Sequence, residues 1–158
     1  MTIANMFLEL TFEELQLMLR NIGSETMVSN PLERFIIYAT IIAKNENKTI
    51  NIKYIQAQSQ HSFYHCNQAI KRLLKNDWIS ESINLQDKRN INLLPTKKSL
   101  ELVRAYEEIR ANSLVQKGVK LPKPKYNITI NDIINSNESQ LNTIKDNFFK
   151  IKNGEFNE

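Results

Sequence analysis

The stretch that decides the fold is SFYHCNQAIKRLLK, residues 62–75. Ser62 can cap a helix, and the apolar residues after it recur at spacings of three and four, which places them on one helical face. That face is predicted to be buried and holds Phe63, Cys66, Ile70, Leu73 and Leu74. The other face carries the polar and basic side chains of Tyr64, His65, Asn67, Gln68, Lys71, Arg72 and Lys75. The pattern therefore predicts an amphipathic helix with a cationic outer face.

Shorter predicted elements precede this helix. Asn30 and Pro31 predict the start of a core helix, because Asn caps helices and Pro suits the first helical turn, and the polar run 45–48 ends it. Residues 49–50 suit a short extended stub, and residues 52–59 suit a brief helix. Two short helices in succession, the second with a basic outer face, are typical of a helix-turn-helix.

Residues 76–95 predict a β-hairpin. Asn76 and Asp77 end the amphipathic helix, and the polar turn at 86–90 separates two apolar runs that suit antiparallel strands. A hairpin that follows a helix-turn-helix is a wing. A long helix is predicted next, reaching about Lys117.

The two ends of the chain are also predicted to be helical. Thr11 and Glu14 have the spacing of a capping box, which predicts a short helix that begins there, ends at Gly23 and has an apolar face of Leu15, Met18 and Leu19. Apolar residues at helical spacing on both sides of a break at 135–137 predict one or two helices within 128–151. Before them, the run 120–125 contains two prolines and predicts an extended linker.

Length and composition are those of one ordinary domain. The chain has 158 residues, 41% of them hydrophobic, so a single domain spanning 1–158 can bury its own core. Cys66 is the only cysteine and cannot form an internal disulfide, and the first residues lack the pattern of a secretory leader. The longest apolar-rich stretch, 35–43, is too short to cross a bilayer. We therefore expect a cytoplasmic protein with no membrane partner.

Charge is unevenly distributed along the chain. The net charge is +4, yet residues 1–30 hold four Glu against one Arg, whereas residues 62–98 hold seven Lys or Arg against three acidic residues. A cationic segment of this kind suits a polyanion, because each phosphate that it neutralises releases condensed counterions. A solvated charged surface is the alternative interpretation of the same pattern.

The middle of the chain resembles MarR-family transcriptional regulators. The resemblance lies in QAIKRLLKNDWI (residues 68–79) and DKRNINLLPTKKSL (residues 87–100), and it covers about 31–117. In that family an Asp-any-Arg triplet lies in the wing, followed by an apolar strand and a Thr at the start of the next helix. Gly is common where this chain has Asp77 and Ser99, and small or hydroxylated residues are usual where it has Tyr64, His65 and Asn67. Related winged-helix groups, including SarA-like regulators, share this core.

The resemblance implies a fold and a set of partners. The fold is mainly α-helical with a small β-hairpin wing, in which a winged helix-turn-helix core at 31–98 is flanked by helical dimerisation regions at 1–30 and 99–158. The implied partners are double-stranded DNA, a second copy of the chain, and a small-molecule effector held between the dimerisation helices and the winged helix. The expected function is that of a homodimeric transcriptional regulator, in particular a repressor.

The candidate DNA-contacting residues form three groups. Base edges in the major groove show a distinct pattern for each base pair, and the residues expected to read them are Tyr64, His65, Asn67 and Gln68. The residues better placed for phosphates are Lys71, Arg72 and Lys75. In the resembled family the wing Arg enters the minor groove and the wing Asp holds it, roles that match Arg89 and Asp87. Ser62 and Lys88 complete the set, and simple solvation is the alternative for each side chain taken alone.

Metal, cofactor and catalytic chemistry are not expected. His61, His65 and Cys66 are close in sequence, but Ser62 as the cap puts His61 outside the helix, and Cys66 lies on the apolar face, so no metal or cofactor is predicted. A regulatory thiol at Cys66 is the less favoured alternative. The three glycines are too dispersed for a phosphate-binding loop, and no catalytic motif is evident, so the chain is not expected to be an enzyme.

Two other functions are compatible with the same fold. A plasmid or phage replication or partition factor would bind repeated tandem sites near a replication origin, in place of one palindrome near a promoter. A winged helix used for protein–protein interaction would show no salt-dependent affinity for any duplex.

Overall fold

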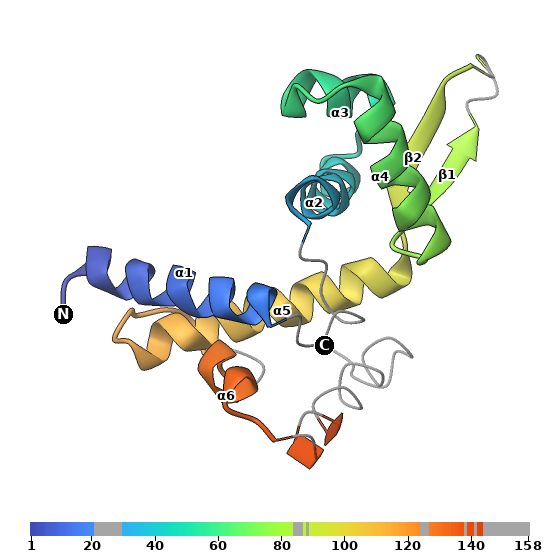
Figure 1. The fold of residues 1–158 in the computed structure, drawn as a ribbon. Coiled ribbons are helices and arrows are strands. Elements are labelled where there is room, and N and C mark those ends of the chain that lie inside the picture. Colours follow the sequence, from blue (N-terminus) through green and yellow to red (C-terminus); the bar gives the residue numbers. More distant parts are fainter. Residues whose placement is uncertain are drawn as a thin grey trace. The chain divides into compact units, whose positions relative to one another are not determined.

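The computed structural model describes residues 1–20, 30–83, 87, 89–123, 127–137, 139, 140, 142 and 143. The chain divides into two compact units. Val28–Leu100 forms one, here named the winged-helix unit, and Met1–Met27 with Glu101–Glu158 forms the other, here named the terminal unit. Figure 1 labels the helices and strands of both.

The winged-helix unit contains the predicted helix-turn-helix and hairpin (Figure 1). Its elements, in chain order, are α2 (Pro31–Asn45), α3 (Ile52–Ser59), α4 (Phe63–Lys75), β1 (Ile79–Ile83) and β2 (Ile91–Pro95), followed by the start of α5 (Lys97–Gln116). The two strands are antiparallel, with Ile79 opposite Pro95 and Ile83 opposite Ile91. Ile50 forms an isolated antiparallel bridge to Leu93, so the predicted extended stub pairs with β2 at this one residue. This mainly helical fold with a two-stranded wing is the predicted fold class.

Asparagine and serine caps set the starts of the three helices before the wing. Asn30 accepts the backbone N–H of Glu33 at 3.1 Å with Pro31 in the first turn, and Ser62 accepts the N–H of His65 at 3.2 Å, as predicted. Asn51 is a further cap, at the start of α3. These contacts satisfy amide groups that have no partner inside the helix.

The core of the winged-helix unit confirms most of the predicted apolar face of α4. Cys66, Ile70 and Leu73 are buried, and they are joined in the unit's core by residues that include Ile36, Ile55, Trp78 and Leu93. Phe63 was predicted to lie on the buried face, and this prediction is wrong, because 56% of the residue is exposed. Phe63 is the first residue of α4 and directly follows the cap Ser62. The spacing of the apolar residues assigns it to the buried face, but at this end of the helix its side chain extends past the core.

Three helices end in the same left-handed turn. At the end of α4, Trp78 donates its N–H to the carbonyl of Leu73 at 2.9 Å, and Asp77 between them has φ 61°. Asn47 after α2 and Gly118 after α5 occupy the same position, with φ 54° and 104°. This hydrogen-bond pattern is the Schellman motif, whose left-handed residue is usually Gly. The motif explains why Gly is common in MarR-family proteins where this chain has Asp77: the position demands positive φ, which Asp tolerates better than most residues.

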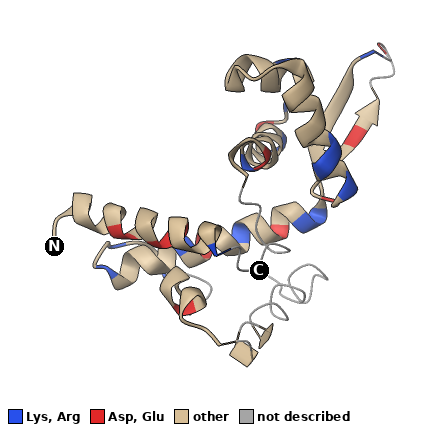
Figure 2. Ribbon diagram, in the orientation of Figure 1, with Lys and Arg blue, Asp and Glu red and all other residues tan. Residues whose placement is uncertain are grey.

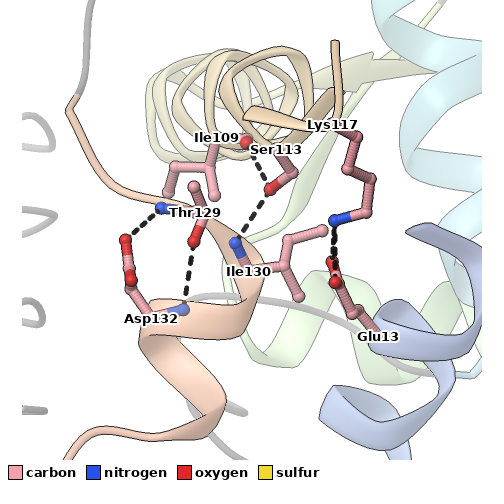
Figure 3. Close-up of polar contacts among 7 residues, drawn as sticks. All are labelled: Glu13, Ile109, Ser113, Lys117, Thr129, Ile130 and Asp132. Carbon is pink, nitrogen blue, oxygen red and sulfur yellow. Dashed lines mark hydrogen bonds and ion pairs between the residues drawn. The ribbon is translucent and has the colours of Figure 1, made fainter. Parts of the chain in front are cut away.

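The terminal unit contains α1 (Ile3–Leu19), the part of α5 from Glu101 onward, and α6 (Ile130–Ile134), which packs against α1. Ser113 of α5 is fully buried and connects two backbones: its hydroxyl donates to the carbonyl of Ile109 at 3.0 Å and accepts the N–H of Ile130 at 2.9 Å (Figure 3). Thr129 and Asp132 close a capping box at the start of α6 (Figure 3). The predicted break at 135–137 is confirmed, because α6 ends at Ile134.

The predicted start of the first helix is wrong. The helix begins at Ile3 with Thr2 as its cap, so Thr11 and Glu14 lie inside it and do not form a capping box. Glu14 instead forms an ion pair with Arg110 and accepts the hydroxyl of Tyr106 at 3.1 Å. The residues of α1 that face inward are Leu10 and Leu17, whereas Leu15 and Leu19 of the predicted apolar face are exposed. Burial of Leu10 favours a helix that begins well before Thr11, the predicted start.

Partly buried ion pairs connect α1 to α5 and to Lys117, the residue directly after α5, within the terminal unit. Lys117 binds both carboxylate oxygens of Glu13, at 2.7 and 2.9 Å, and both side chains are less than 15% exposed (Figure 3). Partial burial lowers the pKa of Arg110, but hydrogen bonds and charge from Glu107 and Glu14 outweigh this effect and raise it above the usual value. Arg110 therefore stays charged at neutral pH.

Parts of the predicted C-terminal region fall outside the described residues. Residues 120–123 of the predicted linker are not helical, and its remaining residues, 124 and 125, are not described. The apolar residues beyond 143, which include Phe148, Phe149 and Ile151, also lie outside the described residues. Among the helices that are described, none is long and apolar enough to span a membrane.

Candidate nucleic-acid interface

The outer face of α4 is open to solvent near its start and along its C-terminal half. Tyr64 is 66% exposed, and the other exposed side chains on this face are those of His65, Lys71, Arg72 and Lys75. Asn67 and Gln68 are half-buried. Figure 2 shows Lys and Arg along the C-terminal half of α4 and at the start of α5, where Lys97 and Lys98 lie. One helix thus presents polar and aromatic groups near its start and cations near its end.

The first turn of α4 organises three ring-bearing side chains around its cap. The Ser62 hydroxyl accepts the N–H of His65 and also lies 3.0 Å from Nδ1 of the His65 ring. The hydroxyl of Ser62, which was predicted to contact DNA, is therefore used to cap α4. His65 stacks edge-on with Tyr64 and His61, with ring centroids 5.8 and 6.4 Å away. These contacts restrict the rotation of the His65 ring.

The cations of α4 differ in their surroundings. Lys71 and Lys75 are exposed, whereas Arg72 forms an ion pair with Glu33 of α2 at 3.5 Å. The predicted phosphate contact from Arg72 therefore competes with a contact that joins α4 to the start of α2. Lys98 donates to the carbonyl of Asn76 at 2.8 Å and lies 4.3 Å from the centre of the Trp78 ring, so it helps to terminate α4.

The turn of the wing contains Asp87 and Arg89, both exposed. The contact that the structure describes between them is a hydrogen bond from the backbone N–H of Arg89 to Oδ1 of Asp87, at 3.0 Å. Asp87 thus acts on the backbone of Arg89, where the resemblance implies a salt bridge to its side chain. Lys88, the third predicted wing residue, lies outside the described residues.

The second strand of the wing and the residue before it are attached to the segment before α3, which the sequence did not reveal. Leu93 donates its N–H to the carbonyl of Ile50 at 2.8 Å, and Nδ2 of Asn51 donates to Oδ1 of Asn90 at 2.6 Å. An Asn directly before a predicted helix was a signal that Asn51 caps α3. Its second partner is 39 residues away, and no local pattern indicates it.

Cys66 is buried and its sulfur has only weak contacts. Sγ lies 3.8 Å from the Ser59 hydroxyl and 4.0 Å from the carbonyl oxygen of His61. Across the part of the chain that the structure describes, no three His, Cys, Asp or Glu residues come together in a group that could hold a metal ion. The placement of Cys66 agrees with the prediction that it packs as a small apolar residue.

Comparison with solved structures relates this fold to transcriptional regulators. A mutant of S. aureus MepR bound to an oligodeoxyribonucleotide is 14% identical, with a TM-score of 0.56 over 99% of both chains. S. aureus MepR bound to ethidium bromide is 13% identical, with a TM-score of 0.53 over 99% of this chain and 98% of that one. The transcriptional regulator Tm0710 from Thermotoga maritima is 15% identical, with a TM-score of 0.55 over 95% of this chain and 88% of that one. No protein-family model and no curated protein matches the sequence.

The helix-turn-helix, the wing and these matches define a winged helix-turn-helix protein. More specifically, the fold is that of MarR-family regulators, as the resemblance of residues 68–79 and 87–100 predicted.

Proposed function

We propose that the chain is a sequence-specific, double-stranded DNA-binding transcriptional regulator. The observation that carries the proposal is the outer face of α4, which is exposed near its start and along its C-terminal half and is followed by a wing whose Arg89 is also exposed. An α-helix fits the major groove of B-form DNA, and an arginine in a wing can reach the adjacent minor groove. A regulator of this kind represses transcription when its DNA site overlaps a promoter. We propose that this chain is such a repressor.

The side chains divide the work of recognition. Tyr64, Asn67 and Gln68 lie on the part of α4 nearest its start, where recognition helices contact base edges, and an amide can pair bidentately with adenine. Lys71 and Lys75 follow on the same face and suit phosphates, which position the protein without specifying sequence.

Replacement of Arg89 tests this proposal. We expect Arg89→Ala to weaken binding to duplexes, selected from a random pool with the wild-type protein, by more than about tenfold while the melting temperature is nearly unchanged. Lys44→Ala, which removes an exposed cation from the last turn of α2, is the matched control and should bind almost normally. Equal affinities for Arg89→Ala and Lys44→Ala would remove the wing from the mechanism, and failure to select any duplex would refute the function.

We further propose that α1 forms part of a homodimer interface. Its solvent-facing side carries Leu8, Phe12, Leu15 and Leu19, at spacings of four, three and four, and each is more than half exposed. This spacing forms one continuous apolar stripe along a helix, and such a stripe favours association. A dimer also supplies two recognition helices for two half-sites about one helical turn apart.

Sedimentation tests the dimer. Leu15→Glu places a charge in the middle of the stripe at a position that is 51% exposed, so the monomer should still fold. We expect the wild-type protein to sediment as a dimer at micromolar concentration and Leu15→Glu as a monomer. Ile83→Glu, an exposed apolar position on β1, is the control and should remain dimeric. A monomeric wild-type protein would refute this part of the proposal.

A small-molecule effector is the third part of the proposal, and a cleft within the winged-helix unit supports it, at a different place from the one that the MarR-family resemblance implies. The cleft has a volume of about 620 Å³ and lies along α2 from Phe35 to the end of the helix, with Phe35, Tyr38, Ile42, Ile50 and Tyr54 among its lining residues. Its size is within the range of ligand sites, and its aromatic lining suits a planar aromatic ligand. Ile50 also bridges to Leu93 of the wing, so a ligand in the cleft would contact a segment that holds the wing.

Ethidium, which is bound to MepR in one matched structure, is a suitable planar aromatic probe. We expect its fluorescence to rise on mixing with the protein in the absence of DNA. Ile42→Lys, at a position 54% exposed, should abolish the rise, because it fills the cleft and repels the cationic probe. Ile83→Lys, outside the cleft, is the control, and an equal rise for both variants would exclude the cleft as the site.

A further inference from the structure

Asn51 uses both ends of its side-chain amide. Its Oδ1 accepts the backbone N–H of Tyr54 at 3.1 Å and so caps α3, while its Nδ2 donates to Oδ1 of Asn90 at 2.6 Å. Because the cap requires the carbonyl oxygen, the NH₂ end is the one that faces Asn90. A single residue therefore begins α3 and also holds the wing at the residue where its turn meets β2.

Asn90 connects this contact to the turn that carries Arg89. The N–H of Asn90 donates to the carbonyl oxygen of Asp87 at 2.9 Å, and the N–H of Arg89 donates to Oδ1 of Asp87 at 3.0 Å. The turn is thus a small hydrogen-bonded unit whose last residue is Asn90. An isolated two-stranded ribbon is only marginally stable in water, so the direction of its tip depends on contacts with the rest of the unit, such as the one that Asn51 makes with Asn90.

We propose that Asn51 is a positioning residue for DNA binding: by holding Asn90 it sets the direction in which Arg89 meets the minor groove. The inference rests on the DNA-binding function proposed above. Other good caps do not replace Asn here. Ser caps well but its hydroxyl is too short to reach Asn90, and an ionised Asp has no N–H to donate.

Asn51→Ser tests the proposal, because Ser keeps the cap and loses the contact with Asn90. The matched control is Asn30→Ser, which makes the same exchange at the cap of α2. We expect Asn51→Ser to bind the selected duplex about fivefold more weakly than Asn30→Ser, the range of one side-chain hydrogen bond, with similar melting temperatures. In an Arg89→Ala background, Asn51→Ser should cause no further loss, because its effect passes through Arg89.

Two results would overturn the proposal: equal DNA affinity for Asn51→Ser and Asn30→Ser, or an effect of Asn51→Ser that is undiminished in the Arg89→Ala background. Hydrogen exchange separates this proposal from the function on which it rests. The amides of Arg89 and Asn90 should exchange faster in Asn51→Ser than in Asn30→Ser, whether or not DNA is bound. If the wild-type protein selected no duplex, the proposed function would fail, and unchanged exchange at these amides would independently refute the contact.

Discussion

Ser113→Ala should destabilise the terminal unit through the N–H of Ile130. Ser113 and Ile130 are both fully buried, and the Ser113 hydroxyl is the acceptor for that N–H at 2.9 Å (Figure 3). The carbonyl of Ile109 keeps its helical partner when the hydroxyl is removed, but the N–H of Ile130 belongs to the first turn of α6, where no intrahelical acceptor exists. The substitution therefore leaves one buried donor without an acceptor.

The expected cost follows from two opposing effects. An unsatisfied buried N–H costs about 1–3 kcal/mol. Replacement of Ser by Ala inside a helix returns roughly 0.5 kcal/mol, because Ala has the higher helix propensity. We expect the free energy of unfolding to fall by about 0.5–2.5 kcal/mol, measured by urea denaturation followed by far-UV circular dichroism, and the amide of Ile130 to lose protection from hydrogen exchange.

Ser136→Ala is the matched control for this experiment. The Ser136 hydroxyl also donates to the carbonyl four residues earlier, that of Asp132, at 2.6 Å, but this contact is exposed to solvent, whereas the contact of Ser113 with Ile130 is buried. Its replacement should change the free energy of unfolding by less than about 0.5 kcal/mol. The reasoning is refuted if Ser113→Ala costs no more than Ser136→Ala, or if the Ile130 amide stays protected.

Three further outcomes are expected. Asp77→Gly should raise the free energy of unfolding by about 0.5 kcal/mol in urea denaturation, because φ is 61° there, and a lower stability would contradict the strain argument. Leu73→Ala should lower it by about 3 kcal/mol in the same assay, since Leu73 is 1% exposed, and a cost below about 1 kcal/mol would show that α4 is poorly packed. Lys71→Ala should reduce the dependence of log K on log salt by about one unit, whereas Arg72→Ala should change it less because Glu33 pairs with Arg72; equal slopes for the two variants would count against this distinction.

The elements with strong local signals could be predicted. The caps at Asn30 and Ser62, the spacing of Cys66, Ile70 and Leu73, and the break after α4 all involve residues within a few positions of one another. The energies that decide such elements, capping and the burial of one helical face, act over the same short range. Most of the candidate DNA-contacting residues could be proposed from the sequence for the same reason, because the exposed face of an amphipathic helix follows from its buried face.

The sequence by itself determined the order of helices and strands around α4 and the position of its polar face, because local hydrogen bonds and periodicity specify both. Tertiary structure alone decided that Arg72 pairs with Glu33 and that Asn51 holds Asn90. Each of these depends on residues that only folding brings together, such as Asn51 and Asn90, which are 39 positions apart. No pattern within a helical turn contains that information, since the partner is selected by packing and not by sequence spacing.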